Sequence, residues 1–199
     1  MEPLEISNGT VFSERRNLYT VSRNPGVRVY GERLVNSGGT EYREWNPTRS
    51  KLAAYLMCGG KTFPFRDDSK VLYLGAASGT TSSHVSDICR NGKVYCIEFS
   101  PRSFRDLVKT ASGRDNMMPI LGDAMKPEEY AFMVENVDIV YADVAQKRQT
   151  DILVDNMETE DRFKSVVNEL KGLGNAILVI EGLDKMMDKM GALDRKSVV

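Results

Sequence analysis

The sequence predicts an α/β fold built on a parallel sheet, and two observations support this prediction. From residue 69 onward, short apolar segments that suit buried strands alternate with segments that have helical spacing. The loops between them are short, so each helix returns the chain to the same sheet through a right-handed crossover. Residues 1–47, by contrast, are rich in β-branched, aromatic and turn-forming residues. We therefore expect a small N-terminal antiparallel β unit over residues 1–47 and an α/β domain over residues 48–199.

The N-terminal unit contains three short candidate strands, at residues 11–12, 18–21 and 27–30. The turn-forming segments 24–26 (Asn-Pro-Gly) and 37–39 (Ser-Gly-Gly) punctuate this region. A core of this size is too small to be stable alone, so we expect the unit to pack against the domain that follows.

A short helix is expected between the two parts. Pro47 has the fixed backbone angle that suits the first position of a helix, and residues 51–57 carry apolar side chains at helical spacing. Gly59 and Gly60 follow this segment and predict where the helix ends.

The elements of the α/β domain follow in alternation. Strands are expected over residues 70–75, 93–98, 117–121, 137–142 and 176–180. Helices are expected over residues 80–88, 101–110 and 149–171, and residues 127–134 form the remaining crossover. Because ligands bind at the carboxyl ends of parallel strands, the residues that follow each strand are the first candidates for chemistry.

Composition narrows the function classes. The chain of 199 residues has 27 Lys and Arg against 28 Asp and Glu, a net charge of −1. A nucleic-acid partner must therefore meet a local basic surface or be carried by another subunit. Cys58, Cys89 and Cys96 lack CxxC spacing, and His84 is the one histidine. We expect neither a metal site nor a disulfide framework, which favours the reducing cytoplasm.

No membrane association is expected either. No apolar run approaches the roughly 20 residues that a membrane-spanning helix needs. The N-terminus also lacks the basic and then apolar order of a signal peptide. These features favour a soluble cytoplasmic protein.

A loop rich in small residues follows the first strand of the predicted parallel sheet. Gly75 and Gly79 allow a tight turn and a close approach of the backbone to a ligand, and residues 76–78 (Ala-Ala-Ser) add little bulk. The GxxxG spacing is neither the GxGxxG of dinucleotide sites nor a phosphate-binding P-loop. It favours a nucleoside without a pyrophosphate. A tight strand–helix turn without any ligand is the alternative.

Acidic residues follow the next three strands. Glu98 lies about 20 residues beyond the glycine loop, where a carboxylate can accept hydrogen bonds from both ribose hydroxyls of a nucleoside. Asp123 follows the third strand and can accept from the amine of adenine, and Asp143 ends the fourth strand. Glu98 could also be an ordinary solvated carboxylate at a strand end. Taken together they match S-adenosylmethionine, which carries a sulfonium and an ammonium but no phosphate.

Six segments resemble archaeal fibrillarin. They comprise the glycine loop with the strand and helix around it, three strand ends and two segments farther upstream, namely residues 71–87, 97–102, 120–124, 142–146, 28–33 and 42–53. The resemblance extends over roughly residues 1–157. It implies a Rossmann-like class I S-adenosylmethionine-dependent methyltransferase fold.

The resemblance also implies an activity and partners. Fibrillarin-like proteins methylate ribose 2′-hydroxyls of rRNA and tRNA. They do so inside a ribonucleoprotein with a box C/D guide RNA, a Nop-family scaffold protein and a kink-turn-binding protein of the ribosomal type. Because the guide RNA selects the target, the chain itself needs no basic composition.

Site residues are implied in the same way. The glycine loop contributes Gly75, Ser78 and Gly79, and the resemblance adds the cofactor contacts Thr80, Thr81, Glu98, Phe99, Asp123, Ala124, Asp143, Val144, Ala145 and Gln146. Phe99 would lie against the adenine, or else pack in the core. Lys51 and Asp143 match the first lysine and the aspartate of a Lys–Asp–Lys catalytic centre. A desolvated lysine beside the sulfonium could accept the proton that a ribose hydroxyl must lose.

The sequence departs from the family after the fifth strand. Glu181 stands where the family has a second catalytic lysine, and the segment that follows does not match the family's final strands. A frameshifted or truncated reading would explain this departure. So would a true divergence in which Lys185 or Lys189 replaces that lysine, or a loss of activity.

These readings leave two functions open. The first is a guide-directed RNA 2′-O-methyltransferase, and the second is a catalytically impaired cofactor-binding subunit of the same ribonucleoprotein. A methyltransferase acting on amino groups is less favoured because no Asn-Pro-Pro-Tyr-type motif follows the fourth strand. A dinucleotide oxidoreductase is disfavoured by the missing GxGxxG.

Overall fold

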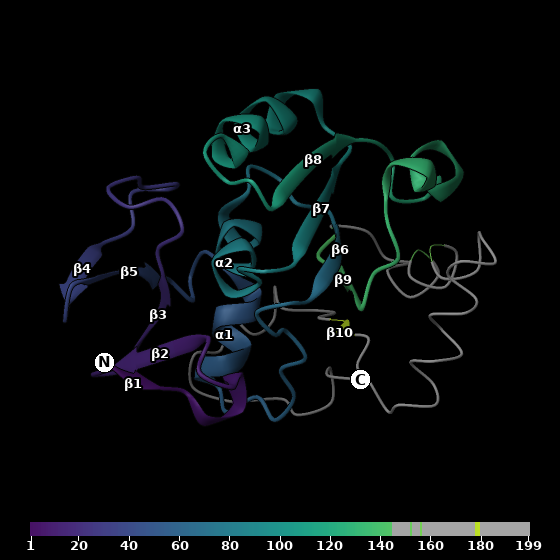
Figure 1. The fold of residues 1–199 in the computed structure, drawn as a ribbon. Helices are drawn as coiled ribbons and strands as arrows, with labels where there is room; N and C mark the ends of the chain where they lie inside the picture. The colour runs from purple at the N-terminus through teal and green to yellow at the C-terminus, as the bar shows by residue number, and fades with distance from the viewer. Residues whose placement is uncertain (145–151, 153–155, 157–177, 180–199) are drawn as a thin grey trace.

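The computed structural model describes residues 1–144, 152, 156, 178 and 179. These residues form an antiparallel N-terminal sheet and a parallel sheet. Helices α1 (Lys51–Met57) and α2 (Thr80–Ile88) lie between the two sheets (Figure 1). The expected α/β class and the additional N-terminal β unit are both confirmed.

The N-terminal sheet has the strand order β1-β2-β3-β5-β4. Its strands β2 and β3 confirm the two strands expected at residues 11–12 and 18–21. The Gly-Gly pair at 38–39 has positive φ angles and closes the β4–β5 hairpin. The bounds are β1 (Glu2–Pro3), β2 (Val11–Glu14), β3 (Asn17–Val21), β4 (Leu34–Ser37) and β5 (Thr40–Trp45), with a 3₁₀ turn η1 (Glu5–Ser7).

The strand expected over residues 27–30 is wrong. The backbone N–H groups of Val29 and Tyr30 donate to the Glu32 carboxylate at 2.9–3.0 Å, so they are not available for a strand ladder. Glu32 itself is buried, with an exposed fraction of 5%. A loop that closes around a buried carboxylate therefore replaces the strand.

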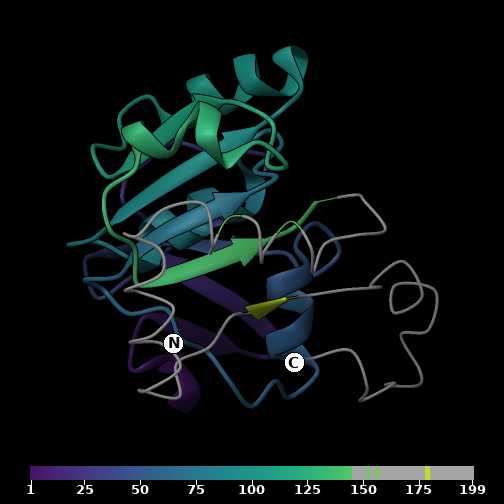
Figure 2. The same cartoon turned by 90° about the vertical axis from the view of Figure 1, so that its right-hand side faces the viewer.

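The parallel sheet has the order β10-β9-β6-β7-β8, and every neighbouring pair is parallel. In Figure 2, β9 is the green arrow and β10 the short yellow one beside it. The strands lie where the alternating pattern predicts them, although β9 begins two residues later than expected. The bounds are β6 (Lys70–Leu74), β7 (Lys93–Glu98), β8 (Met117–Leu121), β9 (Ile139–Ala142) and β10 (Leu178–Val179).

The connecting elements agree with the prediction except at one helix start. Pro47 lies in a turn and not in α1, because Ser50 caps that helix: its side chain accepts a hydrogen bond from Ala53 N–H. Helix α3 spans Pro101–Ala111, and the crossover at 127–134 consists of two 3₁₀ turns, η2 (Pro127–Glu129) and η3 (Ala131–Met133). Of the helix expected over 149–171, only Ile152 and Asn156 are described, and both are helical.

The two faces of the parallel sheet bury different cores. Val71, Tyr73 and Tyr141 point to the face covered by α1 and α2, and they share one apolar cluster with Val11 and Trp45 of the N-terminal sheet. On the opposite face, the side chains of alternate residues pack against the turns η2 and η3. The N-terminal sheet thus shares its core with the α/β part, while the boundary at residue 47 stays a prediction.

Candidate functional site

The carboxyl ends of four neighbouring strands form the rim of interest. Since β9, β6, β7 and β8 are adjacent in that order, the residues that follow them lie along one edge of the sheet. These are Asp143 after β9, the glycine loop after β6, Glu98 at the end of β7 and Asp123 after β8. The topology therefore brings the expected glycine loop and the three carboxylates to the same edge.

The glycine loop is packed so closely that two positions admit no side chain. Gly75 has a φ of +80°, and a Cβ placed on it would lie 2.6 Å from the Asp143 carbonyl oxygen. Gly79 has a φ of +94°, and its Cβ would lie 2.7 Å from Thr110 Cγ2. A hydrogen bond connects the loop to helix α3, since Thr110 Oγ1 donates to the Ser78 carbonyl oxygen at 2.8 Å.

We expect Gly75→Ala to be more destabilising than its backbone angle alone explains. The left-handed conformation costs an L-residue about 1–2 kcal/mol, and here the Asp143 backbone must also move. Gly26→Ala is the matched control, because Gly26 has a φ of +81° with nothing within 4 Å of its Cβ position. Denaturant unfolding of both variants measures the difference. Equal losses of unfolding free energy would contradict the close contact between Gly75 and Asp143.

Glu98 holds the glycine loop against the end of the next strand. One carboxylate oxygen accepts from the Ala77 N–H and the other from the Ser100 N–H, each at 2.8 Å. The residue is 9% exposed, and each oxygen keeps a lone pair for a further donor. The interpretation of Glu98 as a solvated strand-end carboxylate does not agree with this burial.

The adjacent aromatic residue lies in solvent. Phe99 has an exposed fraction of 71%, so packing in the core is excluded. Leu121, at the end of the neighbouring strand β8, is 50% exposed, whereas Ala124 is buried. Asp123 accepts a hydrogen bond from the Met125 N–H at 3.0 Å. The rim beside Glu98 thus presents apolar surface next to carboxylates, a combination that suits an adenosine.

Lys51 and Asp143 form an ion pair at the same rim. Lys51 Nζ lies 2.8 Å from Asp143 Oδ1, and the two side chains are 26% and 19% exposed. Side chains alternate across a strand, so Asp143 continues the face of Tyr141, which is the face that α1 covers. The first residue of α1 therefore meets the residue after β9, and the pair lies directly beside Gly75.

The α1–α2 contact places this lysine. Ser50 caps α1, and the Thr81 hydroxyl donates to Ser50 Oγ at 3.0 Å.

The Thr80 carbonyl oxygen accepts from the Ser83 hydroxyl at 2.9 Å. The expected cofactor contacts of Thr80 and Thr81 stay predictions. Val144 lies beside Gly75, and Ala145 and Gln146 lie outside the described residues.

Two buried tyrosines underneath the ion pair were missed by sequence reasoning. Tyr73 and Tyr141 are neighbours in register, with ring centroids 4.6 Å apart. Burial raises the pKa of both phenols well above the usual value, and the Asp143 carboxylate adds to the rise in each. Alternation could have found them, because each lies two residues before a rim residue, namely Gly75 or Asp143. Both hydroxyls therefore stay protonated.

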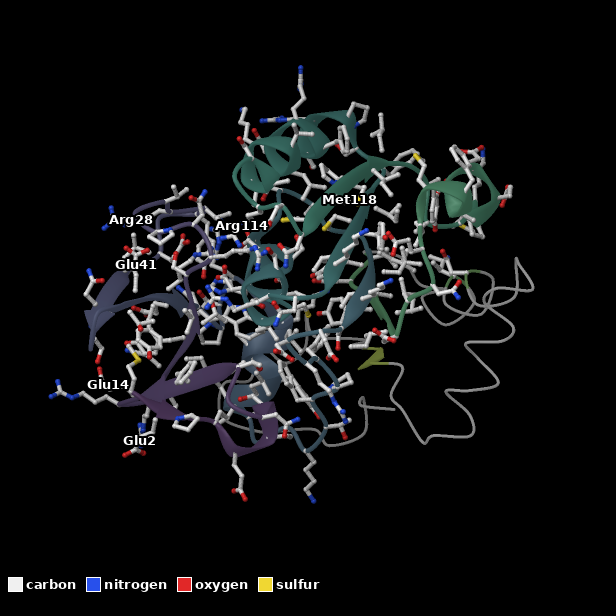
Figure 3. All side chains as sticks on the ribbon, in the orientation of Figure 1. Glu2, Glu14, Arg28, Glu41, Arg114 and Met118 are labelled. Carbon is white, nitrogen blue, oxygen red and sulfur yellow. The ribbon has the colours of Figure 1, made fainter. Side chains whose placement is uncertain are left out.

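A second unexpected feature is a buried ionic network between the two sheets. Arg43 of β5 forms ion pairs with Glu32 and with Asp87 of α2, each at 2.6 Å, and all three side chains are fully buried. Arg114, labelled in Figure 3, adds a further pair with Asp87 at 2.7 Å. The network fastens α2, and with it the glycine loop, to the N-terminal sheet.

Neighbouring side chains complete this network. His84 is stacked on Trp45, with its Nδ1 2.8 Å from the Thr20 hydroxyl and its Nε2 2.8 Å from the Tyr30 hydroxyl. Burial lowers the pKa of His84 well below its usual value, and the guanidinium groups of Arg43 and Arg114 lower it further. The imidazole is therefore neutral, and its two ring nitrogens contact the hydroxyl groups of Thr20 and Tyr30 between the sheets.

Two findings on the described residues concern a metal site and a membrane-spanning helix. Among them, no group of three or more His, Cys, Asp or Glu side chains is arranged to hold a metal ion. The helices of this part of the chain are all too short or too polar to cross a membrane.

The sequence is similar to one family over most of its length. The family model described as Fibrillarin matches residues 6–166. A fibrillarin-like rRNA/tRNA 2′-O-methyltransferase of Methanothermobacter thermautotrophicus is 53% identical over 148 residues, which cover 74% of this chain and 66% of the relative. A protein of the same name from Pyrobaculum aerophilum is 52% identical over 183 residues, 90% of this chain and 72% of the relative. The chain thus spans about two thirds of the length of the relatives it matches.

Solved structures give the same relationship. The structure of Aeropyrum pernix fibrillarin with natively bound S-adenosyl-L-methionine superposes with a TM-score of 0.69 at 42% identity, over 83% of this chain and 81% of that one. A fibrillarin/Nop5p complex superposes with a TM-score of 0.66 at 39% identity, over 82% of this chain and 86% of that one.

Proposed function

The chain belongs to the fibrillarin family, and we propose that it transfers the methyl group of S-adenosylmethionine to ribose 2′-hydroxyls of rRNA and tRNA. The observation that supports this most directly is the ion pair between Lys51 and Asp143, which lies beside Gly75 at the carboxyl edge of the sheet. The relatives at 52–53% identity carry this activity in their names.

The residues at the rim fit S-adenosylmethionine. Three carboxylates, those of Glu98, Asp123 and Asp143, follow three strands of the sheet, and they suit a ligand with two positive charges and no phosphate. The glycine loop carries no side chain at Gly75 or Gly79, where the Asp143 backbone and Thr110 fill the space that a Cβ would need. The exposed ring of Phe99 stands next to Glu98, where an adenine ring could pack on it.

We assign the cofactor contacts along this edge as the sequence predicts them. Glu98 accepts from the ribose hydroxyls, Asp123 from the adenine amine, and Asp143 faces the methionine part. The remaining proposed contacts come from the loops after β6, β7, β8 and β9, namely Gly75, Ser78, Gly79, Thr80, Thr81, Phe99, Ala124, Val144, Ala145 and Gln146.

Lys51 and Asp143 supply the catalytic chemistry in this proposal. The bound cofactor supplies an electrophilic methyl group on its sulfonium. Asp143 holds the Lys51 side chain at the rim, and the lysine orients the 2′-oxygen in line with the methyl–sulfur bond. As the oxygen–methyl bond forms and the methyl–sulfur bond breaks, the hydroxyl proton passes to the Lys51 amine, which must first have released to water the proton that it carries in the ion pair.

The proposed working form is a ribonucleoprotein. A solved fibrillarin has been crystallised in complex with Nop5p, which supports a Nop-family scaffold as partner. We further propose a box C/D guide RNA, which selects the rRNA or tRNA target, and a kink-turn-binding protein of the ribosomal type. A guide supplied by partners agrees with the net charge of −1. Localisation to the cytoplasm stays a prediction.

Glu98→Gln is expected to weaken cofactor binding about 10- to 100-fold. Hydrogen bonds to a charged group contribute about 1.5–3 kcal/mol, and the amide replaces one acceptor oxygen by a donor. Isothermal titration of S-adenosylmethionine into the purified chain measures this loss. Glu135→Gln is the matched control, since Glu135 pairs with Lys70 and Lys93, the first residues of β6 and β7, at the opposite edge of the sheet, and the affinity of this variant should not change. No heat of binding to the unchanged chain would overturn the proposal.

An assay of methyl transfer by the assembled ribonucleoprotein separates the two functions that the sequence leaves open. Chain assembled with its scaffold, kink-turn protein and guide RNA is given methyl-labelled cofactor and a target RNA. Label in the target 2′-O position supports the methyltransferase. Cofactor binding without transfer would favour the impaired subunit instead.

A further inference from the structure

We propose that Ser50 is a positioning residue for Lys51, and that its hydrogen bond with Thr81 keeps the Lys51 ammonium at a fixed position relative to the glycine loop. The inference rests on the proposed function of Lys51. In this inference, the buried hydroxyl groups of Ser50 and Thr81 determine where the lysine ammonium lies. Neither hydroxyl contacts the substrate.

The first argument is the shortness of α1. The helix spans Lys51–Met57 only, and helices of two turns are marginal without tertiary contacts. The direction of its first residue therefore depends on what holds its N-terminus. Ser50 precedes Lys51 directly, and its carbonyl and hydroxyl oxygens accept the Ala54 and Ala53 N–H groups at 3.0 and 3.3 Å.

The second argument is the bond across to α2. Thr81 Oγ1 donates to Ser50 Oγ at 3.0 Å, and the two residues are 6% and 4% exposed. A buried hydroxyl pair has no water to replace a lost partner, so its geometry is well specified. Thr81 lies two residues after Gly79, at the beginning of the helix that the glycine loop opens.

The third argument is that these contacts form a closed circuit. Lys51 Nζ meets Asp143 at 2.8 Å, and the Asp143 carbonyl oxygen lies against Gly75. The chain then runs through the glycine loop to Thr81, and the hydroxyl pair leads back to the residue before Lys51. Breaking the hydrogen bond between Ser50 and Thr81 removes one of these contacts, so the Lys51 ammonium can move relative to the glycine loop.

The position of Thr81 also limits what its hydroxyl can do. Its one hydrogen is donated to Ser50, and the residue is only 6% exposed. The Thr81 side chain is thus engaged beneath the rim. A positioning role explains a threonine here without a hydrogen bond from its hydroxyl to the cofactor, so the cofactor contact proposed for Thr81 is through its backbone.

The test is the isosteric variant Thr81→Val in the assembled ribonucleoprotein. We expect kcat to fall about 10- to 100-fold, because a displacement of about 1 Å costs that much in a positioned reaction. The dissociation constant for S-adenosylmethionine should stay within about twofold. Thr81→Ser keeps the hydroxyl and should restore kcat. Ser82→Ala is the matched control, since its buried hydroxyl in the same helix has no hydrogen-bond partner among the described residues.

Two further variants keep the test decisive. Ser50→Ala breaks the same bond from the other side and also removes the cap of α1, so it should cause at least the same loss, and the double variant should be no worse than Ser50→Ala alone. If Thr81→Val does not fold, Ser50→Ala carries the measurement. A raised dissociation constant at unchanged kcat would instead make the Thr81 hydroxyl a cofactor contact. A lower melting temperature at unchanged kcat would make the bond merely structural.

A second readout does not depend on turnover. In a chain with ¹³C-labelled lysine, the ε-methylene resonance of Lys51, assigned with Lys51→Arg, should shift in Thr81→Val and return in Thr81→Ser. An unchanged resonance in Thr81→Val overturns the positioning role. Absence of methyl transfer by the unchanged chain would refute the proposed function, and the resonance would still decide whether Ser50 places the lysine.

Discussion

Replacing Asp87 by asparagine is expected to lower the free energy of unfolding by about 3–5 kcal/mol. Its carboxylate accepts from Arg43 and Arg114 at 2.6 and 2.7 Å, and also from the Thr20 hydroxyl and the Arg23 N–H. Asparagine keeps the shape but removes the charge and turns one acceptor into a donor. Two buried guanidinium groups then lose their shared counter-ion, which is the costly way to break a buried pair.

The pKa shifts in this network agree with that reasoning. Burial alone would lower the pKa of Arg43, yet the charges of Asp87 and Glu32 outweigh it and the pKa is raised. For Arg114, burial dominates and lowers the pKa despite the opposite effect of Asp87. When Asp87 is replaced, Arg43 keeps its ion pair with Glu32, whereas Asp87 is the one ion-pair partner of Arg114 among the described residues. In Asp87→Asn we expect the contact between Arg114 and α2 to open first.

The measurement is denaturant unfolding followed by circular dichroism, and the chain offers a matched control. Asp115 also pairs with Arg23, but its side chain is 84% exposed. Asp115→Asn should therefore change stability little, as exposed ion pairs do. A similar small loss in both variants would mean that water or movement of Arg43 compensates for the missing charge at position 87.

The elements of the parallel sheet were predictable because each is specified locally. The apolar run of β6 can only be a strand buried on both faces. Helix α2 begins directly after Gly79, whose positive φ ends the loop, and it has the predicted bounds. The edge where the carboxylates meet follows from parallel topology alone. The pairing of Lys51 with Asp143 came from the family resemblance and could not be read from spacing.

The ionic network could not be predicted because its signals are not local. Side chains alternate along β5, so Arg43 lies on the same face as Trp45. A single arginine in a strand is nevertheless ordinarily predicted to be exposed. Its partners Glu32 and Asp87 lie far from it in the sequence or outside any strand, in a loop and in helix α2. One clue was available: α2 is mostly polar, and a polar helix that is nonetheless stable is often packed between two structural units.

Lys51→Met is expected to lower methyl transfer about 10²- to 10⁴-fold in the assembled ribonucleoprotein. This is the usual contribution of a positioned general base. Methionine keeps an unbranched side chain on α1 but has no group that can take the hydroxyl proton or pair with Asp143. Single-turnover transfer with excess enzyme measures the chemical step without product release. Lys70→Met is the matched control, because Lys70 pairs with Glu135 and begins β6, at the opposite edge of the sheet.

Asp143→Asn tests the same pair from the other side. An amide can still accept one hydrogen bond but does not hold an ammonium by charge, so transfer should fall by a comparable factor. If the two residues act as a unit, the double variant Lys51→Met/Asp143→Asn loses no more activity than the worse single variant. Additive losses would mean that Asp143 acts independently of Lys51, for instance on the cofactor.

Cofactor affinity separates these two roles. Lys51 is placed to touch the substrate oxygen, so Lys51→Met should leave the dissociation constant for S-adenosylmethionine within about threefold. Asp143 stands nearer to the glycine loop, and its backbone lies against Gly75. We therefore expect Asp143→Asn to weaken binding as well as transfer. A Lys51→Met chain that transfers methyl groups at the unchanged rate would remove the lysine from the mechanism and leave the 2′-hydroxyl to lose its proton to another group.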